Sequence, residues 1–350
     1  MNRKLLAIAI SGALTVPMAA QAVEFKVGGH VNRAILFTDD GRGSDVRHVD
    51  NTNSSSRINL KGSEALGVGG MKVGFYVEFE HSGNRGVSHT MKGPDTTNAT
   101  VGLRHSAIWF SGKWGKLWAG HTNNAYNSAL GKDFNALFLS GVAFDARNLL
   151  AGSTQFRNGT TGGNVTSLSS TNSGFHGGRK SNLHYITPKM GPFSAAISIA
   201  ENEQWSMRAN LDGSFSGAKY GIGGGYQDQD NESGFSHWGV NGSVQFSQGT
   251  SLKVTYSERD FVAAGRTDAE NLYIKLAHSW GNNAIGVDFN QTDDLAAVND
   301  EYTGWGVGFV HNIPGPKVQL FAGYRNHDLD RPGTSVEDID EFNVGARVRF

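Results

Sequence analysis

The chain has 350 residues, a formal net charge of -1, a mean hydropathy of -0.36 and no cysteine. Its 47 glycines, 7 prolines and 10% aromatic residues fit many strands joined by tight turns. The nearly balanced charge gives no basic footprint for a nucleic-acid partner, and the lack of cysteine excludes disulfide bonds as a source of stability.

The amino-terminal segment predicts export. Arg3 and Lys4 precede an apolar run from Leu5 to Val16, and Ala20-Gln21-Ala22 supplies a small-x-small cleavage pattern. We therefore expect residues 1–22 to be a signal peptide, and residues 23–350 to form one transmembrane barrel domain. No later apolar run reaches the roughly 20 residues that a membrane-spanning helix needs.

The rest of the chain alternates between apolar and polar residues, most clearly in residues 71–80. One face of that segment carries Val73, Phe75, Val77 and Phe79, and the other carries Lys72, Tyr76, Glu78 and Glu80. The predicted strands are 24–38, 55–64, 71–80, 101–111, 115–121, 179–187, 193–200, 205–212, 218–227, 237–246, 251–259, 270–279, 284–291, 302–311, 317–325 and 341–350. Sixteen strands with alternating short and long connections are typical of an antiparallel transmembrane barrel, whereas a soluble sandwich is the alternative.

The final strand, residues 341–350, supports the barrel. Its apolar face ends on Phe350, while Arg347 and Arg349 lie on the opposite face. A last strand with one lipid-compatible face and one polar face is expected at the closing seam of an outer-membrane barrel.

Residues 121–178 interrupt the rhythm of strands, and their length demands a function. Their first half has an apolar stretch, 137–144, that could pack against a wall, so we expect this loop to fold into the lumen and narrow it. A sixteen-stranded barrel is otherwise wide enough for an open aqueous channel.

Charged residues of the loop and the wall predict a constriction. We expect Asp133 and Asp145 to form an acidic rim that faces lumen-side bases, so that opposed charges set a field across the pore. The candidate pore residues are Arg57, Lys61, Asp133, Asp145, Arg147, Lys180, Arg325 and Arg347.

Three segments resemble the Gram-negative general porins. SSRINLKGSEALGVGGMKVGFYVEFE is similar to the family's second-to-third-strand hairpin, FSGKWGKLWAGHTNNAY to the hairpin that leads into the constriction loop, and NLHYITPKMGPFSAAIS to the hairpin that follows it. The terminal Val348-Arg349-Phe350 completes the pattern. The chain departs from the family at Ala65, where an acidic residue is common, and it lacks the Pro-Glu-Phe-Gly-Gly stretch of the enterobacterial constriction loop.

The resemblance implies a water-filled, usually homotrimeric channel in the outer membrane that passes small hydrophilic solutes, with Arg57 on the lumen wall. Its expected partners are further copies of the chain, outer-membrane lipid and lipopolysaccharide. Neither a cofactor nor a metal is predicted. The alternative within transport is a substrate-specific channel for an anion or a sugar, for which Tyr76, Tyr273 and Phe321 are candidate lumen aromatics.

The remote alternative is an outer-membrane hydrolase. His105 and Ser106 are adjacent on one strand and so point to opposite faces, and His184 has no identifiable nucleophile. We therefore predict that the protein is not an enzyme.

Two further patterns yield expectations about the wall. Aromatic residues near strand ends, among them Trp109 and Trp118, are candidates for interfacial girdles. The glycine-rich run Gly221–Gly225 lies inside an alternating strand, and we expect its small residues to face a neighbouring subunit or a bend of the barrel.

Overall fold

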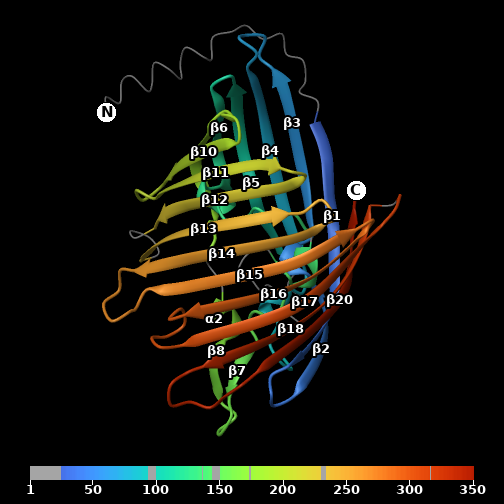
Figure 1. The fold of residues 1–350 in the computed structure, drawn as a ribbon, viewed down its shortest axis with the longest axis vertical. Coiled ribbons are helices and arrows are strands. Elements are labelled where there is room, and N and C mark those ends of the chain that lie inside the picture. Colours follow the sequence, from blue (N-terminus) through green and yellow to red (C-terminus); the bar gives the residue numbers. More distant parts are fainter. Residues whose placement is uncertain are drawn as a thin grey trace.

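The computed structural model describes residues 25–93, 100–135, 137–143, 150–172, 175–229, 234–315 and 317–350. Within these residues, sixteen antiparallel strands form a closed barrel, which confirms the predicted fold (Figure 1). They are β1 (Phe25–Asp39), β3 (Arg57–Ala65), β4 (Lys72–Ser82), β5 (Thr100–Gly112), β6 (Gly115–Asn123), β9 (Arg179–Ile186), β10 (Phe193–Ala200), β11 (Trp205–Phe215), β12 (Ala218–Asp228), β13 (Phe235–Gln245), β14 (Thr250–Phe261), β15 (Ala269–Trp280), β16 (Asn283–Asp293), β17 (Glu301–Ile313), β18 (Val318–Asp330) and β20 (Ile339–Arg349).

The connections hold several shorter elements that the sequence did not predict. They are β2 (Ser44–Asp50), β7 (Gln155–Asn158), β8 (Asn164–Ser167), β19 (Val336–Glu337), the 3-10 turns η1 (Thr52–Ser54), η2 (Gly86–Ser88), η3 (Tyr126–Ser128) and η4 (Leu137–Ser140), and the short helix α2 (Leu168–Asn172). Among the described residues, no helix is both long enough and apolar enough to cross a membrane.

Strand β1 closes the barrel because it pairs along both of its edges. One edge pairs with β20, from His30 opposite Arg349 to Asp39 opposite Asp340. The other edge pairs first with β3 and then with β2. Every barrel strand therefore has a partner on each side, which a membrane barrel requires because hydrocarbon offers no water to satisfy an edge.

The apolar face of each strand points out of the barrel. In β15, Ile274 and Leu276 are exposed on the outside, whereas Tyr273 and Lys275 are buried inside. The same division holds in β20, where Val344 and Val348 are exposed and Arg347 is buried. This pattern is the reverse of a soluble protein and suits a wall with lipid outside and polar groups within.

Pairs of aromatic rings lie on neighbouring strands near the longer connections. The ring centroids are 5.1 Å apart in Trp205–Tyr226, 5.6 Å in Trp238–Tyr256 and 5.4 Å in Trp305–Tyr324, and such rings suit a membrane interface.

The girdle prediction is wrong for Trp109 and Trp118. Both rings lie inside the barrel, where the Lys116 ammonium is 4.0 Å from the first ring centroid and 4.1 Å from the second. The two indoles therefore hold a lysine in the lumen.

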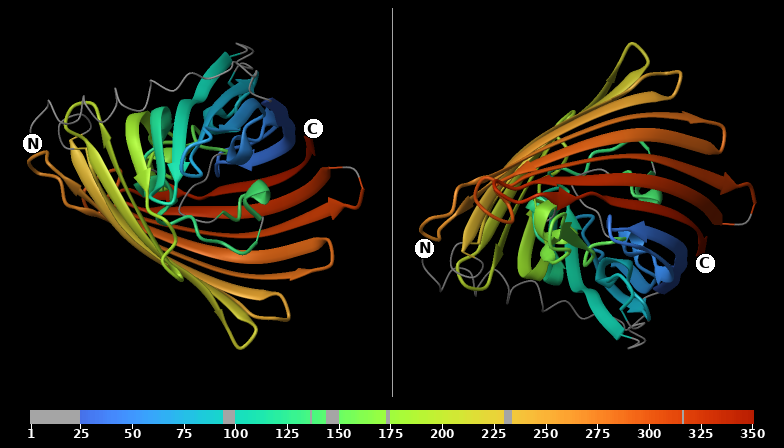
Figure 2. Two further views of the ribbon diagram at one scale, coloured as in Figure 1. Left: turned by 90° about the horizontal axis from the view of Figure 1, so that it is seen from above. Right: turned by 90° about the horizontal axis from the view of Figure 1, so that it is seen from below.

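The loop that follows β6 folds into the barrel, as predicted (Figure 2). Its first half follows the inner wall, where Leu137 and Leu139 are fully buried against residues of β17 and β18. Its second half forms the β7–β8 hairpin, and β7 pairs with β19 in the connection between β18 and β20. The loop is therefore attached both to the wall and to the outer connections.

Salt bridges strengthen the outer attachment. Arg157 on β7 pairs with Asp40 at 2.7 Å, and Arg42 pairs with Glu337 at 3.0 Å. Because Asp40 and Arg42 belong to the β1–β2 connection, two connections of the barrel hold the same hairpin.

Glycines on the inner wall make room for the loop. A Cβ atom on Gly223 would collide with the Ala129 carbonyl, and one on Gly323 would collide with Ser140. A Cβ on Gly225 would lie 2.9 Å from the Tyr126 ring. The expectation that this run faces a neighbouring subunit or a bend is therefore wrong for Gly221, Gly223 and Gly225, which face the constriction loop.

Polar side chains of the wall bind backbone carbonyls of the loop. The donors and their acceptors are Asn51 to Leu139 at 2.7 Å, Asn241 to Ala129 at 2.5 Å, Lys253 to Leu130 at 2.5 Å and to Lys132 at 2.7 Å, Tyr273 to Ala143 at 2.5 Å, Arg325 to Gly141 at 3.0 Å, and Asn343 to Ser140 at 3.1 Å. These bonds satisfy carbonyl groups that a loop packed against a wall cannot fully expose to water.

Two buried ion pairs complete the attachment and correct two expectations. Asp133 of the loop pairs with Lys275 of β15 at 2.5 Å, and Arg325 pairs with Asp288 at 2.8 Å. Asp133 therefore belongs to the contact between loop and wall and not to a free acidic rim. Arg325 lies beneath the loop, where its charge is matched, and does not face the loop across an open gap.

The substitution Gly323→Val tests whether wall glycines seat the loop. Overpacking against Ser140 costs about 1–3 kcal/mol, which should raise protease cleavage within residues 124–143 about tenfold. The matched control is Gly242→Val, because a Cβ at Gly242 meets no atom within 4 Å. Both variants should retain a heat-resistant barrel on gels. If they do, equal protease cleavage of the two variants would refute the role of Gly323 in seating the loop.

The pair Lys275–Asp133 can be tested by a double-mutant cycle. Lys275→Met leaves a carboxylate buried without its partner, which costs about 3–5 kcal/mol. We expect this variant to lose protease protection of the loop, and we expect Lys275→Met combined with Asp133→Leu to regain at least half of it. Full protection in Lys275→Met alone would contradict the attachment.

Candidate functional site: a charge cluster on the pore wall

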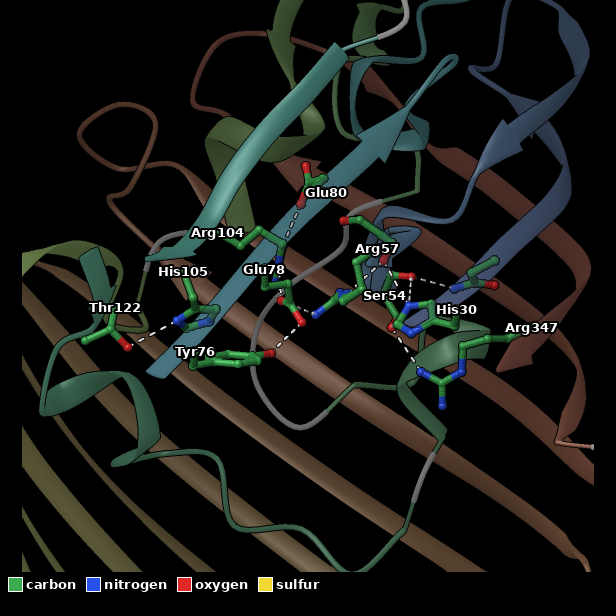
Figure 3. A network of polar contacts seen from close by, with 12 residues as sticks. His30, Ser54, Arg57, Tyr76, Glu78, Glu80, Arg104, His105, Thr122 and Arg347 are labelled. Atoms are coloured by element: carbon green, nitrogen blue, oxygen red, sulfur yellow. Dashed lines mark hydrogen bonds and ion pairs between the residues drawn. The ribbon is translucent and has the colours of Figure 1, made fainter. Parts of the chain in front are cut away.

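A network of charged side chains lies on the inner face of β3, β4, β5 and β20, beside the constriction loop (Figure 3). Arg57 opens β3, and its Nε donates to the Ser55 carbonyl at 2.9 Å. The turn η1 precedes it and lets the chain pass from β2 to β3, which places this guanidinium inside the barrel. The predicted position of Arg57 on the lumen face agrees with this geometry.

Glu78 lies at the centre of the network and is 4% exposed. It accepts hydrogen bonds from the Tyr76 hydroxyl at 2.6 Å, from Arg104 at 2.9 Å and from Arg57 at 3.4 Å. A buried carboxylate is stable only when its lone pairs are satisfied, and these three donors meet that need. Glu78 thus fixes the two arginines relative to each other.

A β-bulge brings Arg104 to the cluster. Glu78 pairs with His105 and Phe79 with Leu103, so Arg104 is an extra residue in β5. Its guanidinium bonds Glu78 and also Glu80, the latter at 2.5 Å. Bulges commonly redirect a side chain in this way, and here the bulge puts Arg104 on the same side as its neighbour His105.

Two further arginines extend the positive charge. Arg347 of β20 donates to Ser54 Oγ at 3.0 Å and to Gln319 Oε1 at 2.8 Å. Arg179, at the start of β9, lies within electrostatic range of Arg57 and Arg104. We call Arg57, Arg104, Arg179 and Arg347 the arginine cluster.

The arginine cluster carries more positive charge than its acidic neighbours carry negative charge. Four guanidinium groups, which stay charged at any physiological pH, meet the two carboxylates Glu78 and Glu80. In the part of the loop that the structure describes, the single carboxylate is Asp133, and Lys275 neutralises it. A lumen wall with excess positive charge lowers the energy of an anion beside it and raises that of a cation.

The other predicted pore residues take different places. Lys61 is exposed on the inner face of β3, four residues beyond Arg57 and nearer the short turns. Lys180 lies at the start of β9, and its ammonium donates a hydrogen bond to the Gln204 side chain. Asp145 and Arg147 lie outside the described residues.

Sequence reasoning missed Arg104, Arg179, Glu78 and Glu80 as members of the site. Glu78 and Glu80 lie on the polar face of the most clearly alternating strand, which forms a hairpin with the strand of Arg57. This arrangement could have indicated that the two carboxylates lie near Arg57. Arg104 offered none, because plain alternation would put it on the face opposite to His105.

The aromatic residues proposed for a sugar track do not form one. Tyr273 is 1% exposed and Phe321 is 2% exposed, because both lie beneath the constriction loop. Tyr76 is in the lumen but its hydroxyl is bound to Glu78. These three rings therefore offer no continuous stacking surface for a sugar.

Comparison with known proteins agrees with the fold. The model of the Gram-negative porin family matches residues 6–332. A search of curated protein sequences gave no match.

Several solved structures share the architecture at low sequence identity. An anion-selective porin from Comamonas acidovorans is 15% identical, with a TM-score of 0.63 over 94% of this chain and all of that one. The trimer form of OmpT, an outer membrane protein of Vibrio cholerae, is 14% identical, with a TM-score of 0.60 over 94% of this chain and all of that one. The outer membrane channel DcaP of Acinetobacter baumannii is 12% identical, with a TM-score of 0.59 over 94% of this chain and 98% of that one.

The barrel, the inserted loop, the charged wall and the family match lead to one identification: the chain belongs to the Gram-negative porin family and is a diffusion channel of the outer membrane.

Proposed function

We propose that this porin passes small hydrophilic solutes by passive diffusion, prefers anions, and works as a homotrimer. The observation that carries the anion preference is the arginine cluster, whose four cations face two carboxylates while the described loop acid is paired with Lys275. The fold of an anion-selective porin from Comamonas acidovorans is compatible with this proposal.

The pore residues divide into two groups in this proposal. The arginine cluster sets the preference for anions, and Lys61 and Lys180 add positive charge to the inner wall. Asp145 and Arg147 add further charges of the constriction loop to the pore. Asp133 and Arg325 act indirectly, by holding the loop against the wall.

Three further properties belong to the proposal. The trimer form of a structural neighbour supports a homotrimer, and the exposed apolar outer face supports contact with lipid and lipopolysaccharide. We infer that residues 1–22 are removed as a signal peptide and that residues 23–350 form the working channel. We also infer that the protein catalyses no reaction, since its relatives in fold are channels.

A substrate-specific anion channel is the second candidate, favoured by the same arginine cluster. The two candidates differ in saturation: a general channel shows flux proportional to concentration, whereas a specific channel saturates. Liposome swelling with graded small anions and uncharged sugars of equal size separates them.

The anion preference can be tested by reversal potential in planar bilayers under a potassium chloride gradient. We expect wild type to favour chloride. In Arg57→Gln with Arg179→Gln, Arg104 still binds Glu78 and Glu80, so the cluster keeps its frame but becomes neutral. Loss of two unit charges from the lumen wall should reduce the chloride-to-potassium ratio at least about fivefold.

The control for this measurement is Lys113→Gln with Lys189→Gln. It removes two lysines from turns outside the strands and leaves the inner wall intact. A wild-type channel that favours potassium, or an equal fall of the ratio in the control, would overturn the proposed preference.

A further inference from the structure

The inner wall below the arginine cluster carries a second group of cations, in which Lys61 has a neighbour of the same charge. Lys26 on β1 and Lys61 on β3 are direct partners in the strand register, and both are exposed. Directly opposed residues on neighbouring strands have Cβ atoms about 5 Å apart. Two ammonium groups are therefore presented side by side.

Both lysines point into the lumen. Lys26 lies on the same face of β1 as His30 and Asn32, which bond inward to η1 and the segment after it. Phe25 and Val27, on the other face, are 62% and 55% exposed to the outside. Lys61 shares its face with Arg57 and lies opposite Tyr76 in the register.

No carboxylate of the described residues pairs with these two lysines. Among the described residues, neither Lys26 nor Lys61 forms an ion pair. Glu78 and Glu80 of this wall are already bound by arginines. The carboxy-terminal Phe350 lies beside Gly29 of β1, but among the described residues it pairs with neither lysine. Like charges that face each other across a strand pair destabilise a sheet, so the fold itself gains nothing from this arrangement.

Two more lysines lie one step nearer to the short turns. Lys72 of β4 and Lys116 of β6 both pair with Ser111 of β5, one on each side. Trp109 and Trp118 hold the Lys116 ammonium in place. A line of positive charge therefore continues from the arginine cluster toward the end of the barrel that carries the short turns.

We propose that Lys26 and Lys61 form a binding site for small polyvalent oxyanions, with Lys72 and Lys116 extending the positive field toward the exit. A dianion placed between the two ammonium groups removes their repulsion and gains two charge-assisted hydrogen bonds. A monovalent anion can gain only part of this electrostatic stabilisation. This inference rests on the proposed function, because it adds a retaining site to an anion-preferring channel.

The test is block of single-channel current by inorganic pyrophosphate, with the purified protein in planar bilayers in potassium chloride. We expect pyrophosphate to reduce the current in a saturable way. Orthophosphate should reduce the current more weakly, and extra chloride at equal ionic strength should not reduce it. Lys26→Gln with Lys61→Gln should raise the half-blocking concentration at least about tenfold.

Two variants make the result specific. Lys26→Arg with Lys61→Arg keeps both charges and should keep the block by pyrophosphate. If the glutamine variant does not fold, this arginine variant still tests the site, because loss of block in it contradicts the proposal. Lys113→Gln with Lys189→Gln removes equal charge from the turns and should leave the block unchanged. Unchanged block in the lysine-pair glutamine variant, or loss of block in the arginine variant, overturns the site.

The outcome separates this inference from the proposed function. An open channel that prefers chloride but is never blocked by pyrophosphate refutes the lysine site and leaves the anion preference intact. A channel that prefers potassium refutes the preference, whatever pyrophosphate does. Block that persists in Arg57→Gln with Arg179→Gln shows that the site lies apart from the arginine cluster.

Discussion

The hydrogen bonds and ion pairs from the inner wall to the constriction loop are the interactions on which the pore depends. A sixteen-stranded barrel needs no loop in order to close, and without one its lumen is a wide water-filled space. Lys253, Tyr273 and Asn343 each direct a donor to a loop carbonyl, and wall glycines leave the volume that the loop occupies. Where these contacts lie decides where the solute passes.

The same contacts divide the charges of the lumen between two walls. On β15, β16 and β18, charged groups pair with one another or with the loop, as Lys275 does with Asp133 and Arg325 does with Asp288. On the wall from β1 to β6, positive charges remain in excess. The loop therefore covers the neutralised wall and leaves the basic wall to face the solute, so attachment and selectivity are served by different sets of residues.

The sequence predicted the barrel well because alternation, turn residues and connection lengths are local and repeat in every strand. All sixteen strands and the inserted loop were visible in this way. The site was harder to predict, since it depends on contacts between distant segments. Asp133 and Arg325 have the residue types of a constriction, but only the path of the loop shows that each is paired. Arg104 enters the lumen through a one-residue bulge that alternation does not reveal.

The pairing of β7 with β19 gives the constriction loop a mechanical property. A loop fixed only to the wall would behave as a flap with a free tip. This loop is instead held in two places, by the wall at η4 and by the outer connections at β7. The outer connection at residues 331–338 therefore contacts the same loop that narrows the pore, so the outer surface and the constriction share one structural element.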